Sequence, residues 1–426
     1  MSLTSYPRLD EQLFTRVLSN GLTVMVVPRP GFRKKTAYFA TNFGSIHREF
    51  RWKGEHYSLP AGIAHFLEHK MFDLPGRDVS EELASMGAHF NAFTSYDMTA
   101  YHFTCTDNFD PCLDLLLEFV STPYFTEESV QKELGIIDQE IGMHADSPDS
   151  VVFDMFAQGM YRYHDIRTPI LGNCQSIRQI TPQLLELCHE AFYIPSNMIL
   201  CVVGDVDPER VVAAAEKRLG TQYREPGEKL PFPEEDMTVL KSFCQAQMEI
   251  AMPSFQLGFK CEPLETGEEG VRWEILSDLA AEALFGESSQ LYLELYRQGI
   301  IDTSFGGGFE TVDGCAMLTC GGDSRDPEAV RTAILERARY LACNGVEEKD
   351  FLRMKRSALG RRIRDLGSFD STCFRMCAYR FDGFDYFCFP QIYEQITARE
   401  LKEFLDRVVR EERCVLSVIY PVKEET

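Results

Sequence analysis

The alternation of apolar and polar positions near the N-terminus predicts a β-hairpin. Two apolar runs, residues 16–18 and 22–27, flank the dipeptide Asn20-Gly21, and this dipeptide favours the tight turn that joins antiparallel strands. Further runs of strand length, rich in β-branched and aromatic residues, follow in the first half of the chain. These expected strands are residues 36–43, 88–94, 98–106 and 198–203.

Helical spacing of apolar residues predicts three helices between these strands. The first lies within residues 58–76, the second runs from Thr126 to about His144, and the third is capped by Asp207 and ends at Gly220. In the first two, the apolar residues recur at helical intervals and therefore share one face. These residues are Ile63, Phe66, Leu67 and Met71, and Val130, Leu134, Ile137 and Ile141.

The order of elements in the first half recurs in outline in the second half. Residues 83–106 run from a helix end through a glycine turn into strands, and residues 297–320 follow the same course. The helical stretch 132–141 likewise has a counterpart at 351–363. Such self-similarity indicates that two similar units arose from one by duplication.

A stretch of linker composition separates the two halves. Residues 223–236 contain three prolines and seven charged side chains, and a chain of 426 residues is longer than one hydrophobic core usually serves. We therefore expect an α+β protein of two similar domains, each a mixed or antiparallel sheet with helices packed on it, arranged like a clam. The predicted domains are residues 1–222 and 239–426, joined by a linker at 223–238.

Composition narrows the classes of function. A net charge of −23 argues against a nucleic-acid binder, because phosphate would be repelled. No apolar run is long enough to cross a bilayer, and the N-terminal residues lack the charged and then apolar pattern of a secretion signal. The fourteen cysteines are scattered without the spacing of a zinc knuckle, which is typical of free thiols in a reducing compartment. We therefore expect a cytoplasmic protein.

The candidate chemistry lies in the first expected helix, at His65-Phe66-Leu67-Glu68-His69. Residues four apart lie one above the other on a helix, so both imidazoles can reach one metal ion. Glu68 lies beside them, where it can take a proton from a metal-bound water. This H-x-x-E-H pattern is the inverted form of the H-E-x-x-H motif of zinc peptidases. All nine histidines lie at or before position 189, so any imidazole ligands come from the first domain.

A catalytic zinc ion usually has three protein ligands and one open position. The third ligand has three candidates on the second expected helix. Glu133 and Glu140 are two turns apart on one face, and His144 lies one turn further along. Spacing alone does not choose among them.

Four sequence stretches resemble the pitrilysin, insulinase and mitochondrial processing peptidase family. They are GIAHFLEHKMF, NAFTSYDMTAY, KELGIIDQEI and VVGDVDPERV, in that order, and the resemblance covers nearly all of residues 12–220. In that family two carboxylates seven residues apart follow the inverted motif, and the second binds zinc. The resemblance thus implies that Glu140 is the third zinc ligand. It also implies that Glu133 does not bind the metal but supports the ligands and orients the site. It leaves His144 without a role.

The resemblance also implies a substrate-binding strand at Asn91, Ala92, Phe93 and Thr94. An extended peptide can add to the edge of a sheet through backbone hydrogen bonds, which demands little of its sequence. Pattern alone is equally consistent with an ordinary interior strand.

The second half departs from the family in one place. Single-chain and homodimeric relatives tend to carry an Arg and a Tyr there that hold the substrate carbonyl. Here Gln290 and Asp302 stand at the apparent positions. Either the pair is Tyr292 and Arg297, or a second subunit supplies it. We therefore expect a homodimer, or a heterodimer with a related subunit.

Together these features predict a zinc metalloendopeptidase with one Zn²⁺ per chain. It would hydrolyse internal bonds of short or unfolded peptides, with Glu68 activating the zinc-bound water. One alternative is a non-catalytic scaffold subunit of a peptidase-like heterodimer. The intact set of His65, Glu68 and His69 argues against a scaffold, and the missing Arg/Tyr pair argues for it. Another alternative is a different metal hydrolase.

Overall fold

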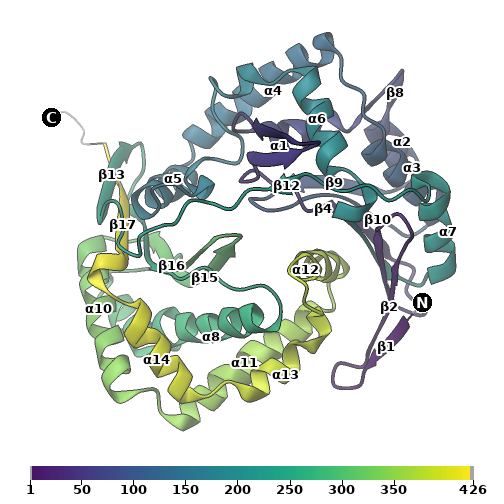
Figure 1. Ribbon diagram of the computed structural model, residues 1–426. Coiled ribbons are helices and arrows are strands. Elements are labelled where there is room, and N and C mark those ends of the chain that lie inside the picture. Colours follow the sequence, from purple (N-terminus) through teal and green to yellow (C-terminus); the bar gives the residue numbers. More distant parts are fainter. Residues whose placement is uncertain (1, 423–426) are drawn as a thin grey trace. The chain divides into compact units, whose positions relative to one another are not determined.

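The structure, a computed structural model, describes residues 2–422 and divides into two compact units. The first unit comprises the chain up to Ile141, Pro169–Leu230 and Ile363–Cys388. The second comprises Gly142–Thr168, Pro231–Arg362 and the chain from Phe389 onward. Each unit contains a sheet with helices packed against it (Figure 1). The predicted α+β class is confirmed.

A seven-stranded mixed sheet forms the framework of the first unit, in the order β1-β2-β3-β11-β4-β10-β9. Neighbouring strands are antiparallel except β11 and β3, which are parallel. The predicted hairpin corresponds to β2 and β3. The strands are β1 (Ser2–Tyr6), β2 (Glu11–Val17), β3 (Thr23–Pro28), β4 (Lys35–Thr41), β9 (His89–Thr94), β10 (Thr99–Cys105) and β11 (Met198–Gly204).

Helices and two small sheets complete the first unit. The residues 223–238, expected to be a linker, contain a short strand that pairs with β5 in a three-stranded sheet. The helices are α1 (Ile63–Lys70), α2 (Val79–Ser85), α3 (Phe109–Ser121), α4 (Glu127–Ala145), α6 (Pro182–Phe192), α7 (Pro208–Leu219) and α12 (Phe369–Phe381). The short strands are β5 (Glu49–Trp52), β6 (Glu55–Ser58), β7 (Asp73–Leu74), β8 (Arg77–Asp78) and β12 (Glu228–Lys229).

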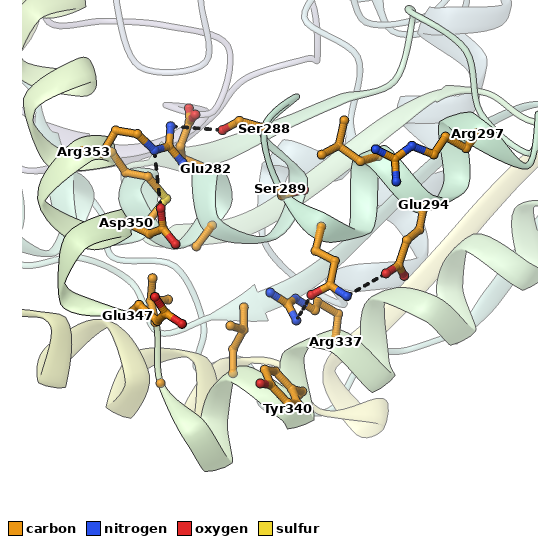
Figure 2. Close-up of a pocket in the computed structure, with 17 residues that line it drawn as sticks. Glu282, Ser288, Ser289, Glu294, Arg297, Arg337, Tyr340, Glu347, Asp350 and Arg353 are labelled. Carbon is orange, nitrogen blue, oxygen red and sulfur yellow. Dashed lines mark hydrogen bonds and ion pairs between the residues drawn. The ribbon is translucent and has the colours of Figure 1, made fainter.

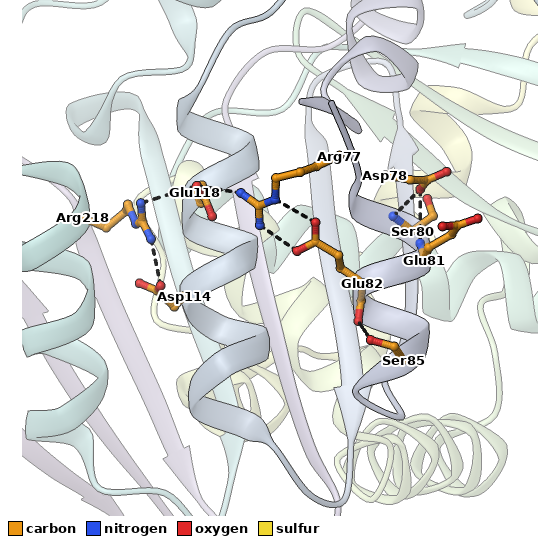
Figure 3. Close-up of polar contacts among 9 residues, drawn as sticks. All are labelled: Arg77, Asp78, Ser80, Glu81, Glu82, Ser85, Asp114, Glu118 and Arg218. Atoms are coloured by element: carbon orange, nitrogen blue, oxygen red, sulfur yellow. Dashed lines mark hydrogen bonds and ion pairs between the residues drawn. The ribbon is translucent and has the colours of Figure 1, made fainter. Parts of the chain in front are cut away.

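Arginines join several of these helices at the surface (Figure 3). Arg77 pairs with Glu82 of α2 and with Glu118 of α3, and Arg218 of α7 pairs with Glu118 and with Asp114 of α3. Exposed pairs of this kind contribute little each, so the buried apolar face of α3 is the stronger link to the sheet.

The sheet of the second unit repeats the order of five strands of the first, β3-β11-β4-β10-β9. This five-stranded sheet has the order β13-β17-β14-β16-β15, and again one pair, β13 and β17, is parallel. The strands are β13 (Phe243–Met248), β14 (Ser254–Cys261), β15 (Gly306–Val312), β16 (Cys315–Asp323) and β17 (Cys414–Pro421). The helices are α5 (Pro148–Met160), α8 (Glu268–Phe285), α9 (Gln290–Arg297), α10 (Pro327–Asn344), α11 (Glu348–Asp365), α13 (Phe389–Gln395) and α14 (Ala398–Val408).

Each half of the chain contributes one helix to the other half's sheet. Helix α5 comes from the first half but packs on β13, β14 and β17, whereas α12 comes from the second half and packs on β4 and β11. Cys373 of α12 is fully buried, with its sulfur 3.7 Å from the backbone oxygen of Cys201 in β11. The compact units therefore follow the predicted ranges 1–222 and 239–426 only in part.

Glycine at position 62 shapes the start of α1. Gly62 has φ of 90°, and a Cβ built there would lie 2.4 Å from the carbonyl oxygen of Leu171. Ile63, Phe66 and Leu67 follow it and are buried, and α1 contacts β9, β10 and α6. The side-chain-free turn thus lets the chain pass close to Leu171 as α1 enters the core.

We predict that Gly62→Ala lowers the melting temperature more than Gly76→Ala does. Both glycines have positive φ, of 90° and 68°, but a Cβ at Gly76 meets no atom within 4 Å. Gly76→Ala should cost only the roughly 1–2 kcal/mol of a left-handed alanine. Gly62→Ala adds overlap with the backbone, roughly 1–3 kcal/mol more. The melting temperatures are measured by circular dichroism. Equal values for the two variants would contradict the inferred close contact between Gly62 and Leu171.

Candidate metal centre

Helices α1 and α4 bring three metal-ligating side chains together in the first unit. One ligand atom each from His65, His69 and Glu140 lies within 4.8 Å of the others. Glu140 Oε2 is 3.7 Å from His65 Nε2 and 3.8 Å from His69 Nε2. Two imidazole nitrogens and one carboxylate oxygen form a donor set that suits a catalytic zinc ion, with a position left for water or substrate.

His65 is held in the form that can bind a metal. Burial, together with the nearby His69, lowers the pKa of His65 to about 4. The ring is therefore neutral near pH 7, and a neutral imidazole nitrogen is what a metal ion requires. The buried Nδ1 of His65 has no hydrogen-bond partner, whereas Nε2 faces Glu140.

His69 is oriented by a carboxylate behind it. Its Nδ1 donates a hydrogen bond to Glu133 Oε1 at 2.9 Å, which leaves Nε2 directed toward Glu140. Burial opposes a charge on His69, but the hydrogen bond to Glu133 and the nearby Glu68 and Glu140 outweigh it and raise the pKa of His69. Burial likewise opposes the charge of Glu133, yet His69 and Lys70 lower the pKa of Glu133. A carboxylate behind a ligand histidine fixes the ring orientation and increases its basicity.

Glu68 is the buried carboxyl beside this group. It is 8% exposed and accepts a hydrogen bond of 2.7 Å from Thr94 Oγ1, at the end of β9. Burial raises the pKa of Glu68, although the Thr94 hydrogen bond and His69 partly oppose the shift. A raised carboxyl pKa suits a group that must take up a proton and release it again.

His144 is occupied elsewhere. Its Nε2 lies 2.8 Å from Asp154 Oδ2 of α5, and both residues belong to the second unit. The three-atom group therefore includes Glu140 and does not include His144.

Comparison with known proteins identifies the family. Residues 55–173 match the model described as Insulinase (Peptidase family M16), and residues 179–358 match the Peptidase M16 inactive domain. The uncharacterized zinc protease YmfH of Bacillus subtilis is 36% identical over 424 residues, which cover 98% of each chain. The chain belongs to peptidase family M16. The predicted family is confirmed.

Solved structures of similar proteins agree with this assignment. An M16-like peptidase from Alicyclobacillus acidocaldarius has a TM-score of 0.93 and 31% identity, with 97% of this chain and 99% of that chain covered. The periplasmic protease PqqL from Escherichia coli has a TM-score of 0.74 and 19% identity, and this chain covers 48% of its length. The second match is a likeness of fold, to a chain about twice as long.

Strand β9, which carries the predicted substrate-binding residues, is the edge strand of its sheet. It pairs with β10 and with no other described strand, so the interior position considered from the sequence is wrong. Asn91 is exposed, whereas Ala92, Phe93 and Thr94 are half-buried. Thr94 is the last residue of β9 and donates a hydrogen bond to Glu68. The free edge of this strand therefore ends beside Glu68, the candidate general base.

The second-half candidates for carbonyl contacts lie in the second unit. Gln290 accepts a hydrogen bond from Arg337 and donates one to Glu294, and Asp302 accepts two from Ser304. Figure 2 shows Arg297 and Arg337 lining a groove of about 490 Å³. Tyr292, which forms the alternative Arg/Tyr pair together with Arg297, is buried and stacks on Tyr296.

Lys70 is a site residue that sequence analysis missed. It is 1% exposed, bonds the carboxylate of Asp73 and lies 3.8 Å from Glu133 Oε2. The one signal in the sequence was the position of this lysine, directly after His69 and followed by the apolar Met71 and Phe72.

Among the helices of residues 2–422, none is long and apolar enough to span a bilayer.

We predict that His65→Ala and His69→Ala each abolish zinc retention, whereas His144→Ala leaves it unchanged. The first two remove a ligand atom from the three-atom group, and the third removes only the contact with Asp154. Zinc content of the purified variants, measured by plasma mass spectrometry, checks this. Full zinc occupancy in the His65 and His69 variants would rule out the assigned site.

Proposed function

We propose that this M16 chain is a zinc metalloendopeptidase that hydrolyses internal bonds of short or unfolded peptides. One observation carries the proposal. One ligand atom each of His65, His69 and Glu140 lies within 4.8 Å of the others. The buried carboxyl beside them, Glu68, accepts a hydrogen bond from Thr94 at the end of the edge strand β9. Family membership supports it, because the matching model is described as a peptidase family and relatives are named zinc proteases.

In this proposal His65, His69 and Glu140 hold one zinc ion, which supplies Lewis-acid polarisation of water and of the scissile carbonyl when it is bound. Glu68 accepts the proton of the attacking water and returns it to the leaving amine. Its buried position beside the three ligands and its hydrogen bond from Thr94 Oγ1 hold the carboxyl where it can make both transfers. Glu133 keeps the ring of His69 in place throughout.

The substrate binds in extended form along β9 in this proposal. The side of β9 that faces away from β10 pairs with no other described strand, so an extended peptide can add to it by backbone hydrogen bonds. The peptide would take the Ala92 N–H from Asn91 Oδ1, which accepts from it at 3.0 Å. A folded protein hides its backbone in its own helices and sheets, so short or unfolded chains are the expected substrates. The fourteen free cysteines support a reducing compartment, the cytoplasm, as the place of action.

A partner subunit is part of the proposal. The family resemblance implies an Arg/Tyr pair where this chain has Gln290 and Asp302, and both of these residues already have partners within the chain. We infer that a related subunit supplies the Arg/Tyr pair that holds the carbonyl, in a heterodimer. The competing possibility is a homodimer in which Arg297 does so. If zinc binds but no peptide is cleaved in either state, a scaffold subunit is the better description.

We predict that Glu68→Gln retains zinc and loses peptide hydrolysis by roughly 10²-fold or more, because the amide cannot accept a proton. Glu140→Gln should instead weaken zinc retention. Metal content and cleavage of a quenched fluorescent peptide are measured on the same samples. Loss of zinc from the Glu68 variant together with full zinc in the Glu140 variant would reverse the two roles.

We predict that the isolated chain cleaves peptides slowly and gains roughly 10²–10³-fold when a related subunit that carries the Arg/Tyr pair and lacks H-x-x-E-H is added. The gain reflects charge stabilisation at the carbonyl oxygen. Activity is titrated against added subunit, with Arg297→Ala as the matched variant. High activity from the chain alone that is lost in Arg297→Ala would favour the homodimer and leave the zinc site intact.

A further inference from the structure

Lys70 is a charged residue in the interior of the first unit. It is 1% exposed and directly follows His69 at the end of α1, a helix whose residues other than His69 are buried. Lysines are almost never fully buried unless they are paired, because the ammonium loses its hydration. Two carboxylates provide the pairing. Asp73 of β7 bonds the ammonium directly, and Glu133 Oε2 lies 3.8 Å from Nζ.

The two oxygens of Glu133 have different partners. Oε1 accepts the hydrogen bond from His69 Nδ1 at 2.9 Å, and Oε2 faces the ammonium of Lys70. The Glu133 side chain is 13% exposed, so water offers few substitute donors. With both oxygens committed, the carboxylate plane has one favoured orientation, and that orientation directs Oε1 at His69.

We propose that Lys70 is a positioning residue that sets the metal affinity of the centre through Glu133. The inference rests on the proposed zinc function. Lys70 holds Glu133, Glu133 holds the His69 ring, and the ring presents Nε2 beside His65 and Glu140. Lys70 also places a positive charge beside Glu133, 3.8 Å from its Oε2, which strengthens its hold on that carboxylate.

A double-mutant cycle on zinc affinity tests the chain of contacts. Lys70→Met keeps the length of the side chain and suits a buried position, and it should weaken zinc binding roughly 10-fold in competition with a chelator. Glu133→Gln should weaken binding by roughly 10- to 100-fold. Lys70→Met added to Glu133→Gln should then have no further effect, because the route through Glu133 is already broken. Independent, additive losses would overturn the proposal.

Asp73→Asn is the matched control, because it removes the other partner of Lys70 and leaves Glu133 untouched. It should keep zinc affinity within about 2-fold of the wild type, since the ammonium still faces Glu133. If Asp73→Asn lowers zinc affinity as much as Lys70→Met does, the effect comes from the contact with β7 and not from Glu133. That result would overturn the proposal.

A spectroscopic readout separates positioning from a general loss of stability. The visible absorption of the cobalt(II)-loaded protein reports ligand geometry, and Lys70→Met should shift it in the same direction as Glu133→Gln. If Lys70→Met does not fold, Lys70→Gln replaces it, with a smaller shift expected. A wild-type spectrum and wild-type affinity in the folded variant would overturn the role of Lys70. Unchanged zinc binding in His65→Ala would instead defeat the proposed zinc function itself.

Discussion

The hydrogen bond between His69 and Glu133 joins two helices whose contacting residues are 64 positions apart in the chain. Helix α1 presents both imidazoles on one face because they are four residues apart. Nothing in α1 decides which ring nitrogen points outward. Glu133 accepts from Nδ1, and this contact fixes the ring and brings α4 close enough for Glu140 to face both Nε2 atoms. The geometry of the whole centre depends on this single link.

The charge around the candidate centre suits a divalent cation. Glu68, Glu133 and Glu140 lie in one region of the first unit, and the proximity of Glu140 contributes to the raised pKa of Glu68. Lys70 balances only part of this negative charge. A cation held between the imidazoles and Glu140 would relieve the remaining repulsion, because Coulomb interactions are strong where water is scarce. The same cation would then favour the ionised form of Glu68.

The histidines of this duplicated fold all come from the first half of the chain. The five strands of the second sheet repeat the order β3-β11-β4-β10-β9 of the first, with one parallel pair in each, but the second half of the chain contains no histidine. Its match to a family model described as an inactive domain is consistent with that composition. Helices α5 and α12 each pack on the sheet built mainly by the other half. Each sheet therefore receives one of its packing helices from the other half of the chain.

The sequence by itself determined the family and the α+β class, and helical spacing pointed to His65, Glu68 and His69 as one face of a helix. Spacing along α4 left Glu133, Glu140 and His144 open, and only the family resemblance named Glu140 as the third ligand with Glu133 supporting it. The tertiary structure shows the contacts themselves: Glu133 accepts from His69, Glu140 faces both imidazoles and His144 pairs with Asp154. The sequence showed neither the packing of α5 and α12 on the other half's sheet nor the burial of Lys70. An apolar face shows that a helix packs, but its partner is set by contacts between residues far apart in the chain.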